Sequence, residues 1–267
     1  KFGNLKVLNF DDSEFLTEIP DVSGLPNLKE LSFNGCGSLI TVHPSIGLLN
    51  KLQILSADGC SKLTTFPPLN LTSLESLKLS NCFSLENFPE ILGEMKNLRE
   101  LFLENLTLKE LPVSFQNLVG LEHLYLEYCE IGCFPSSIVV MPELSIVNAT
   151  NCKGWQWVKS EKGEEKVGSI VCSNVCDFSV GGCNLYDDFF STGFMQLDHV
   201  ITLYLRNNNF TFLPECIKEF KFLRRLDVSG CLHLQEIRGV PPNLKDFDAT
   251  ECISLSSSSS TSMLLNQ

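Results

Sequence analysis

The chain has 267 residues, 43% hydrophobic and 19% charged, and its 20 Lys and Arg against 32 Asp and Glu give a formal net charge of −12. This balance is typical of a globular protein and excludes a disordered chain; the acidic excess argues against nucleic acid as the main partner, because phosphate binding needs clustered Lys and Arg. No run of about 18 apolar residues occurs, which excludes a transmembrane helix in this sequence. Because the sequence begins at Lys1 inside a patterned segment, we expect it to be part of a longer protein.

One apolar template, L-x-x-L-x-L-x-x-C/N, recurs along almost the whole chain. In chain order its units begin at Leu5, Leu28, Leu52, Leu74, Leu98, Leu121, Leu144, Val175, Val200, Leu223 and Leu244. The first seven starts are 22 to 24 residues apart, a spacing typical of leucine-rich repeats. The L-x-L alternation predicts a short strand in each unit, and because one unit cannot bury its apolar side alone, neighbouring units must stack.

The second half of several units ends in an apolar residue followed by proline, at Pro20, Pro67, Pro89, Pro112, Pro135 and Pro214. Proline suits the first position of a short helical turn, and about 23 residues leave too little chain for a long helix. The sequence therefore predicts an α/β repeat protein, a leucine-rich-repeat solenoid or horseshoe with a concave parallel β-sheet and short helical or 3₁₀ turns on its convex side.

The repeat spacing divides the chain into four segments. They are about seven repeats in residues 1–155, a charged irregular insertion in 156–174, about four repeats in 175–255 and a Ser-rich tail or linker in 256–267. The interval from Leu144 to Val175 is 31 residues, about eight more than the others, so we expect a mobile loop on the outer side of the solenoid. Trp155 and Trp157 either pack under this loop or form a docking site.

Cysteine recurs at one template position in eight units. These residues are Cys36, Cys60, Cys82, Cys129, Cys152, Cys183, Cys231 and Cys252. We expect thiols that pack as small hydrophobic groups and satisfy backbone groups of the adjacent loop, with disulfide pairing as the alternative. Free thiols indicate a reducing compartment, the cytosol or the nucleus.

Catalytic, cofactor-binding and metal-binding motifs are not recognisable in the sequence. The Cys129/Cys133 and Cys172/Cys176 pairs have zinc-like spacing, but no second ligand pair lies near them in the sequence. No nucleotide-binding or hydrolase motif occurs. The chain is therefore predicted not to be an enzyme, and its function is expected to reside in a surface.

Strand residues between the inward apolar positions point to the concave face, because side chains alternate along a strand. The candidate protein-binding residues on this face are Arg99, Phe102, Glu104, Tyr125, Glu127, Tyr128, Tyr204, Arg206, Arg224 and Arg225. Phe102 and Tyr125 hold equivalent positions on adjacent strands, which fits either ordinary cross-strand stacking or a partner site. The hypothesis is that the Phe102/Tyr125/Tyr128 group contacts the ligand and the Arg206/Arg224/Arg225 group meets another domain.

Specific runs carry a resemblance to a known family. They are Leu28–Cys36, Leu226–Cys231 with its Ser-Gly-Cys ending, and Gly239–Leu244 with Val-Pro-Pro-Asn-Leu. These runs resemble the leucine-rich-repeat region of plant intracellular disease resistance proteins of the Toll/interleukin-receptor-type, nucleotide-binding class (TIR-NBS-LRR), and the similarity covers residues 1–255.

The resemblance implies a recognition module that senses a pathogen effector or an effector-modified host protein and restrains a nucleotide-binding switch in defence signalling. It further implies intramolecular contacts with nucleotide-binding and Toll-type domains, location in the cytoplasm with the nucleus as a second compartment, and no membrane or nucleic-acid partner. ADP/ATP binding and any NAD cleavage would belong to domains outside this chain. The alternatives are a cytosolic leucine-rich-repeat scaffold for signalling proteins and a substrate-recruiting arm of a ubiquitin ligase.

Overall fold

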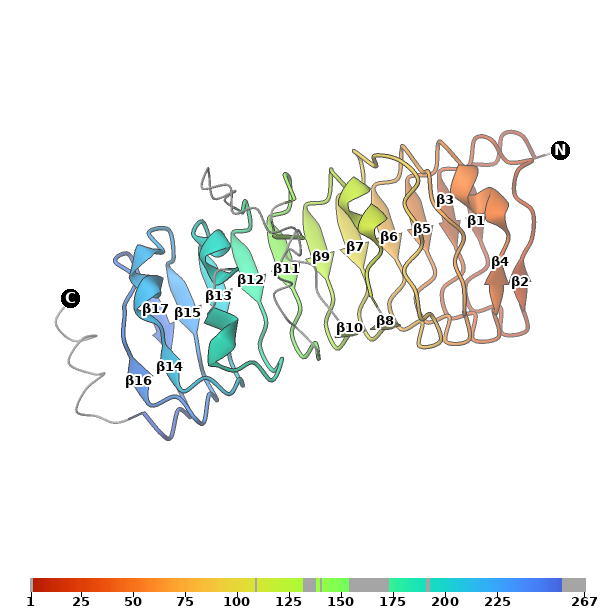
Figure 1. The fold of residues 1–267 in the computed structure, drawn as a ribbon. Coiled ribbons are helices and arrows are strands. Elements are labelled where there is room, and N and C mark those ends of the chain that lie inside the picture. Colours follow the sequence, from red (N-terminus) through yellow and green to blue (C-terminus); the bar gives the residue numbers. More distant parts are fainter. Residues whose placement is uncertain are drawn as a thin grey trace.

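A computed structural model describes residues 2–108, 110–131, 138–139, 141–153, 173–190 and 193–255. Each predicted unit forms one short strand, and the strands stack side by side along an elongated coil (Figure 1). They build an eleven-stranded parallel sheet in the order β1-β3-β5-β6-β7-β9-β11-β12-β13-β15-β17. This confirms the predicted leucine-rich-repeat solenoid with a long parallel sheet.

Each strand of the eleven-stranded sheet has three residues. Their bounds are β1 (Val7–Asn9), β3 (Glu30–Ser32), β5 (Ile54–Ser56), β6 (Ser76–Lys78), β7 (Glu100–Phe102), β9 (His123–Tyr125), β11 (Ile146–Asn148), β12 (Asp177–Ser179), β13 (Thr202–Tyr204), β15 (Arg225–Asp227) and β17 (Asp246–Asp248). The central residue of each strand pairs with the central residue of the next, as Leu101 does with Leu124. This in-line register places equivalent residues of all units in straight rows across the sheet.

Further along each coil, three pairs of two-residue strands form small parallel sheets. They are β2 (Glu18–Ile19) with β4 (Thr41–Val42), β8 (Thr107–Leu108) with β10 (Glu130–Ile131), and β14 (Phe212–Leu213) with β16 (Glu236–Ile237). The helices of the described ranges are 3₁₀ helices of four or five residues, namely η1 (Pro44–Leu48), η2 (Val113–Asn117), η4 (Asp187–Phe190), η5 (Phe194–Leu197) and η6 (Glu215–Glu219). No helix in these ranges has the length and apolar character needed to cross a membrane.

The proline signal predicts the helical turns only in part. η2 and η6 follow Pro112 and Pro214, which are the N-cap residues, one position before the expected one. Pro20, Pro67 and Pro89 are followed by no helix. The buried residue stands three positions after the proline in η2 and η6, at Phe115 and Ile217, and two positions after Pro20, Pro67 and Pro89. Pro135 lies outside the described residues.

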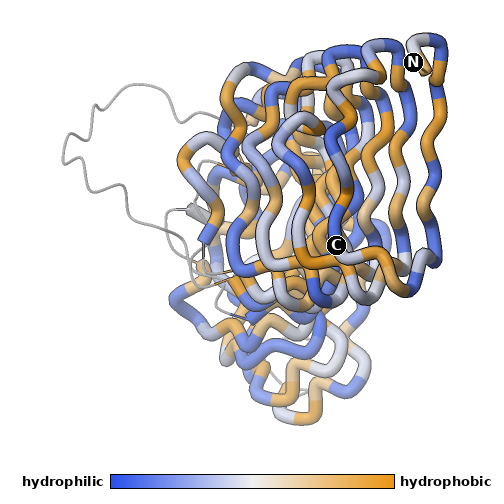
Figure 2. The backbone as a smooth tube through the Cα atoms, turned by 90° about the vertical axis from the view of Figure 1, so that its right-hand side faces the viewer, coloured by the Kyte–Doolittle hydropathy of each residue, from blue (hydrophilic) through white to orange (hydrophobic). Residues whose placement is uncertain are grey.

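The core is one continuous stack of apolar rows running through the solenoid. The central strand residues Leu31, Leu55, Leu77, Leu101 and Leu124 are fully buried. Figure 2 shows hydrophobic residues recurring at the same level on successive turns. Among the central residues of the eleven described strands, those of the two end strands, Leu8 and Phe247, are partly exposed, because an end strand has a neighbour on one side only.

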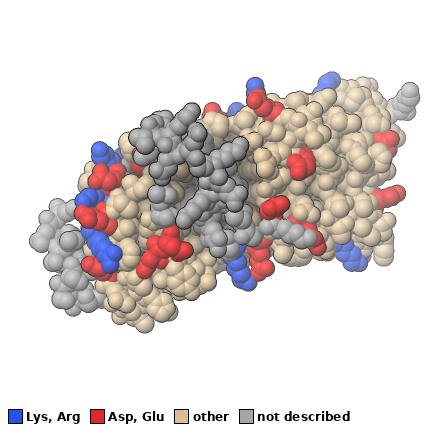
Figure 3. Space-filling view, viewed as in Figure 1, with Lys and Arg blue, Asp and Glu red and all other residues tan. Residues whose placement is uncertain are grey.

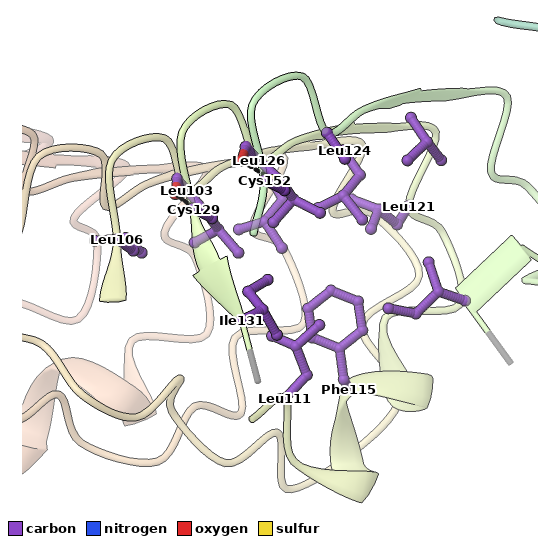
Figure 4. Close-up of a cluster of buried hydrophobic side chains, with 14 of the residues drawn as sticks. Leu103, Leu106, Leu111, Phe115, Leu121, Leu124, Leu126, Cys129, Ile131 and Cys152 are labelled. Atoms are coloured by element: carbon purple, nitrogen blue, oxygen red, sulfur yellow. Dashed lines mark hydrogen bonds between the residues drawn. The ribbon is translucent and has the colours of Figure 1, made fainter. Parts of the chain in front are cut away.

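The repeated cysteines are buried thiols that bond to the backbone. The Sγ of Cys129 donates to the carbonyl oxygen of Leu103 at 2.7 Å, and that of Cys152 donates to Leu126 at 2.7 Å (Figure 4). The same bond to the preceding coil is made by the six other cysteines of the row, Cys36, Cys60, Cys82, Cys183, Cys231 and Cys252. The structural interpretation is confirmed, and the disulfide alternative is wrong for the ten described cysteines, which are all free.

Several predictions lie outside the described residues. The insertion at 156–174 (apart from Ser173 and Asn174), Trp155, Trp157, the tail at 256–267, Cys133 and Cys172 are among them. Within the described ranges, no three His, Cys, Asp or Glu side chains are grouped so that they could hold a metal ion.

Candidate protein-binding surface

The outward face of the long sheet presents three parallel rows of side chains. The first row contains the first residue of each strand, the second row the last residue, and the third row the residue two positions beyond. Backbone bonds such as those from Asn81 to Glu104 and from Asn105 to Glu127 keep successive coils aligned beside the third row. Because the residues between the rows are buried, these rows are what a partner would meet.

An aromatic stack occupies the middle of the second row. The Phe102 and Tyr125 ring centroids lie 4.8 Å apart with an interplanar angle of 10°. Lys78, one strand earlier, places its Nζ 5.2 Å from the Phe102 centroid. Both rings are half-buried, so cross-strand stacking is present and part of each ring remains open to a partner.

Carboxylates flank this stack, and most of them have partners. Glu104 accepts a hydrogen bond from the Ser80 hydroxyl, and Glu127 accepts one from Nδ2 of Asn148 at 2.6 Å. Burial first, and then the nearby negative charges of Glu100, Glu104 and Asp177, raises the pKa of the Tyr125 phenol. The middle of the sheet face is therefore aromatic and negatively charged.

Tyr128 does not join the aromatic stack. It lies in the turn just beyond the third row, with a φ of 58° and 58% of its surface exposed. Other units place Gly35, Gly59 or Asn105 at this left-handed position. The predicted Phe102/Tyr125/Tyr128 group is thus a stacked pair and a separate exposed ring beside Glu127.

The predicted basic residues lie nearer the C-terminal end of the sheet. Tyr204 is in the second row, Arg206 in the third and Arg225 in the first, while Arg224 immediately precedes its strand. Arg225 is paired with Asp246, with 2.6 Å between Nη2 and Oδ2, whereas Arg206 and Arg224 have no ion pair among the described residues. Near the stack, Arg99 is paired with Glu122.

Sequence reasoning missed the residues that separate these two groups. Strands β11 and β12 place Asn148 and Ser179 in the second row and Thr150 and Gly181 in the third. A polar depression of about 360 Å³, lined among others by Thr150, Gly181 and Arg206, opens beside them. Aligning the repeat units would have shown small residues at these row positions. However, β12 belongs to the unit that matches the template weakly.

Charged side chains on the face seen in Figure 3 are unevenly distributed. Acidic and basic groups are interspersed at the C-terminal end, and much of the remaining visible surface carries few charges. Towards the N-terminal end of this face, most of the visible charged groups are single acidic residues, and the few basic groups lie at its margins.

Comparisons with known proteins agree on a family and a fold. Residues 70–265 match the family model described as disease resistance protein RPS4B-like, leucine-rich repeats. The chain is 27% identical to TMV resistance protein N of Nicotiana glutinosa, over 91% of this chain and 25% of that protein. It is 34% identical to disease resistance protein RPP5 of Arabidopsis thaliana, over 91% of this chain and 16% of that protein. The chain therefore spans a quarter or less of these relatives.

Solved structures show the same fold at low sequence identity. The leucine-rich repeat domain of the type III effector XCV3220 (XopL) superimposes with a TM-score of 0.57 and 19% identity, covering 91% of this chain and 76% of that one. The functional domain of InlJ from Listeria monocytogenes, which includes a cysteine ladder, gives a TM-score of 0.59 and 15% identity, covering 93% and 54%. These likenesses establish the fold alone.

Proposed function

Because the chain belongs to the leucine-rich-repeat family of RPS4B-like plant disease resistance proteins, we propose that it is the protein-recognition module of an intracellular immune receptor. The family resemblance stated from the sequence is thereby confirmed. In this proposal the solenoid senses a pathogen effector or an effector-modified host protein, and it restrains the receptor's nucleotide-binding switch until then. No observation favours the scaffold or ubiquitin-ligase alternatives.

The observation that carries the proposal is the chemistry of the sheet face. Eleven aligned strands present three outward rows whose large members, apart from Val7, Ile54 and Ile146, are aromatic or charged. The Phe102/Tyr125 stack lies in the middle and arginines lie near the C-terminal end. Aromatic residues and Arg are enriched at the anchor points of protein interfaces. Stacked repeats supply a broad surface of this kind without any catalytic group.

We assign the two groups on this face to different contacts. The Phe102/Tyr125/Tyr128 group contacts the effector or modified host protein, and the Arg206/Arg224/Arg225 group contacts a nucleotide-binding or Toll-type domain of the same receptor. Nucleotide exchange, with ADP and ATP as cofactors, belongs in this proposal to domains outside this chain. The receptor acts in the cytoplasm and also in the nucleus.

The test uses the complete receptor expressed in leaf tissue, compared with the same receptor lacking residues 1–267. Cell death without any pathogen, caused by the deletion alone, is the expected result, because the switch would have lost its restraint. If the truncated receptor accumulates and stays silent, the restraint is wrong. Alanine substitution of both groups tests the contacts, and unchanged recognition and unchanged resting silence would contradict their assignment.

A further inference from the structure

A strip of small side chains, called the notch below, separates the two residue groups on the sheet face. On one side, β9 and the residues after it supply Tyr125 and Glu127; on the other, β13 and its continuation supply Tyr204 and Arg206. The second and third rows in between hold only Asn148, Ser179, Thr150 and Gly181. Tyr125 and Glu127 thus form one wall and Tyr204 the other, while the small side chains in these two rows form the floor.

Hydrogen bonds among the small side chains of the floor hold them close to the sheet. The hydroxyls of Thr150 and Ser179 are hydrogen-bonded at 2.8 Å, and both residues are buried. Asn148 is drawn towards the wall by its bond to Glu127. At Gly181, an added Cβ would lie 2.8 Å from Cγ and 3.3 Å from Nε of Arg206. The absence of a side chain there lets Arg206 lie along the floor of the third row.

One carboxylate in the notch lacks a partner. Asp177 stands in the first row between Ile146 and Thr202, and it is half-buried. It has no ion pair and no hydrogen bond to its carboxylate within the described part of the chain, and burial raises its pKa. A partly desolvated carboxylate without a counter-charge costs free energy in the free protein, and a cation from outside would remove that cost.

The opposite end of the notch carries the opposite charge. Arg206 is exposed and unpaired among the described residues, while its neighbour Asp227 accepts bonds from the Ser229 amide and hydroxyl at 2.9 and 2.6 Å. Four residues of strand separate Asp177 from Gly181, so the two charged ends are about 13 Å apart.

We propose that the notch over β11 and β12 seats an extended loop of a partner protein, which presents a basic side chain to Asp177 and a carboxylate to Arg206. This inference rests on the proposed recognition function and names the chemistry of its partner. Three strand spacings, about 14 Å, separate the backbones of β9 and β13. Once the walls are subtracted, this width admits one extended chain and not an α-helix of 10–12 Å diameter. A ligand of one charge sign would be repelled at one end.

The probe is a phage-displayed library of random 12-residue peptides, selected on the complete 267-residue chain. Enriched peptides are expected to carry Lys or Arg and Asp or Glu about four residues apart. Asp177→Asn and Arg206→Gln should each weaken their binding by about tenfold, since each removes one charge-assisted contact. Ser179→Trp fills the floor and should abolish binding.

A matched control comes from the same row. Ser56 lies in the second row on β5, is 6% exposed against 7% for Ser179, and likewise forms a hydroxyl hydrogen bond to a third-row side chain. Ser56→Trp should leave peptide binding unchanged. Asp177→Lys should restore the binding of a peptide whose basic residue is replaced by Glu, a rescue that misfolding could not produce.

The notch is refuted if no peptide is enriched, if the enriched peptides lack the charge pair, or if Asp177→Asn and Ser179→Trp bind as the wild type does. The leaf deletion assay separates this failure from that of the proposed function. Cell death after deletion combined with failed peptide selection would overturn the notch alone, while a silent deletion would overturn the restraint whatever the peptides do.

Discussion

Tyr128 holds a backbone conformation that non-glycine residues rarely adopt, with a φ of 58°. In an L residue this left-handed region costs roughly 1–2 kcal/mol. The exposed ring recovers little of that cost by packing, because 58% of its surface is accessible. The same left-handed turn recurs in the other units, so the cost at this position comes from placing a tyrosine where most units have Gly or Asn.

Replacing Tyr128 by glycine should therefore stabilise the protein. We expect Tyr128→Gly to raise the free energy of unfolding by about 0.5–1 kcal/mol, the strain relieved less the entropy that glycine adds to the unfolded chain. Urea denaturation measures the change. Asn105→Gly, at the same turn of the preceding unit, should give no gain, because Asn tolerates this conformation. A loss of stability in Tyr128→Gly would show that the ring contributes packing.

Asp177 should make the protein less stable as the pH rises. Burial raises the pKa of its carboxyl above the usual value, so the folded state binds the proton more tightly than the unfolded state does. Stability from this group is therefore present below the unfolded pKa and lost as the pH rises through the higher folded pKa. Asp177→Asn should raise the melting temperature at pH 7 and flatten its dependence on pH in the acidic range.

Asp248, a carboxylate whose pKa is shifted in the opposite direction, provides the control. Asp248 accepts hydrogen bonds from the hydroxyl and the amide of Thr250, and these bonds lower its pKa. Its contribution is present above the unfolded pKa and lost as the pH falls. Asp248→Asn should therefore lower the melting temperature at pH 7. Equal shifts in both variants would contradict the environment assigned to Asp177.

At the scale of the element, the cysteine row acts as a spine between successive coils. Each thiol donates to a backbone carbonyl of the coil before it, and Asn208 takes over this role in one unit through Nδ2 bonds to Val180 and Leu205. Burial raises the pKa of the Cys183 thiol to about 12 and of the Cys231 thiol to about 11. Protonated donors are what this arrangement needs, and they are poor nucleophiles.

Alkylation of the folded protein should follow this difference in burial. Among the described cysteines, Cys176 and Cys216 are only partly buried, and we expect iodoacetamide to modify them before any member of the row. Peptide mapping by mass spectrometry gives the order, and unfolding in urea should make all of them react alike. Early modification of Cys183 or Cys231 in the folded protein would show that the row is accessible.

At the scale of the whole molecule, the sequence predicts the repeat architecture better than it predicts the binding surface. Template positions such as Leu101, Leu124 and Cys129 recur with regular spacing, so strands, core and thiol row could be derived from the pattern. The notch depends on which residues become neighbours across β11 and β12, and those strands are separated by the longest interval between units. Asp177 and Gly181 could not be ranked from local spacing, because their roles come from Tyr125 and Arg206 on other coils.

The sheet crosses this long interval without a break in register. Val147 of β11 pairs with Phe178 of β12, and Phe178 pairs with Leu203 of β13. Phe178 is fully buried, and it takes a position that leucine or valine fills in the neighbouring strands. In a solenoid each repeat contacts only its neighbours, so stability is approximately a sum of repeat and interface contributions. Phe178 thus lies where the seven N-terminal strands join the four C-terminal ones.

Truncating this side chain should weaken that junction locally. We expect Phe178→Ala to cost about 3–5 kcal/mol through lost burial and the cavity left behind. Hydrogen–deuterium exchange by mass spectrometry should show faster exchange in β11, β12 and β13, fading with distance, while β3 and β5 exchange as before. Phe222→Ala, at a ring that is 53% exposed, should change neither the free energy of unfolding nor the exchange of these strands. Uniformly faster exchange along the whole chain would mean that the solenoid unfolds as a single unit and that coupling extends well beyond neighbouring repeats.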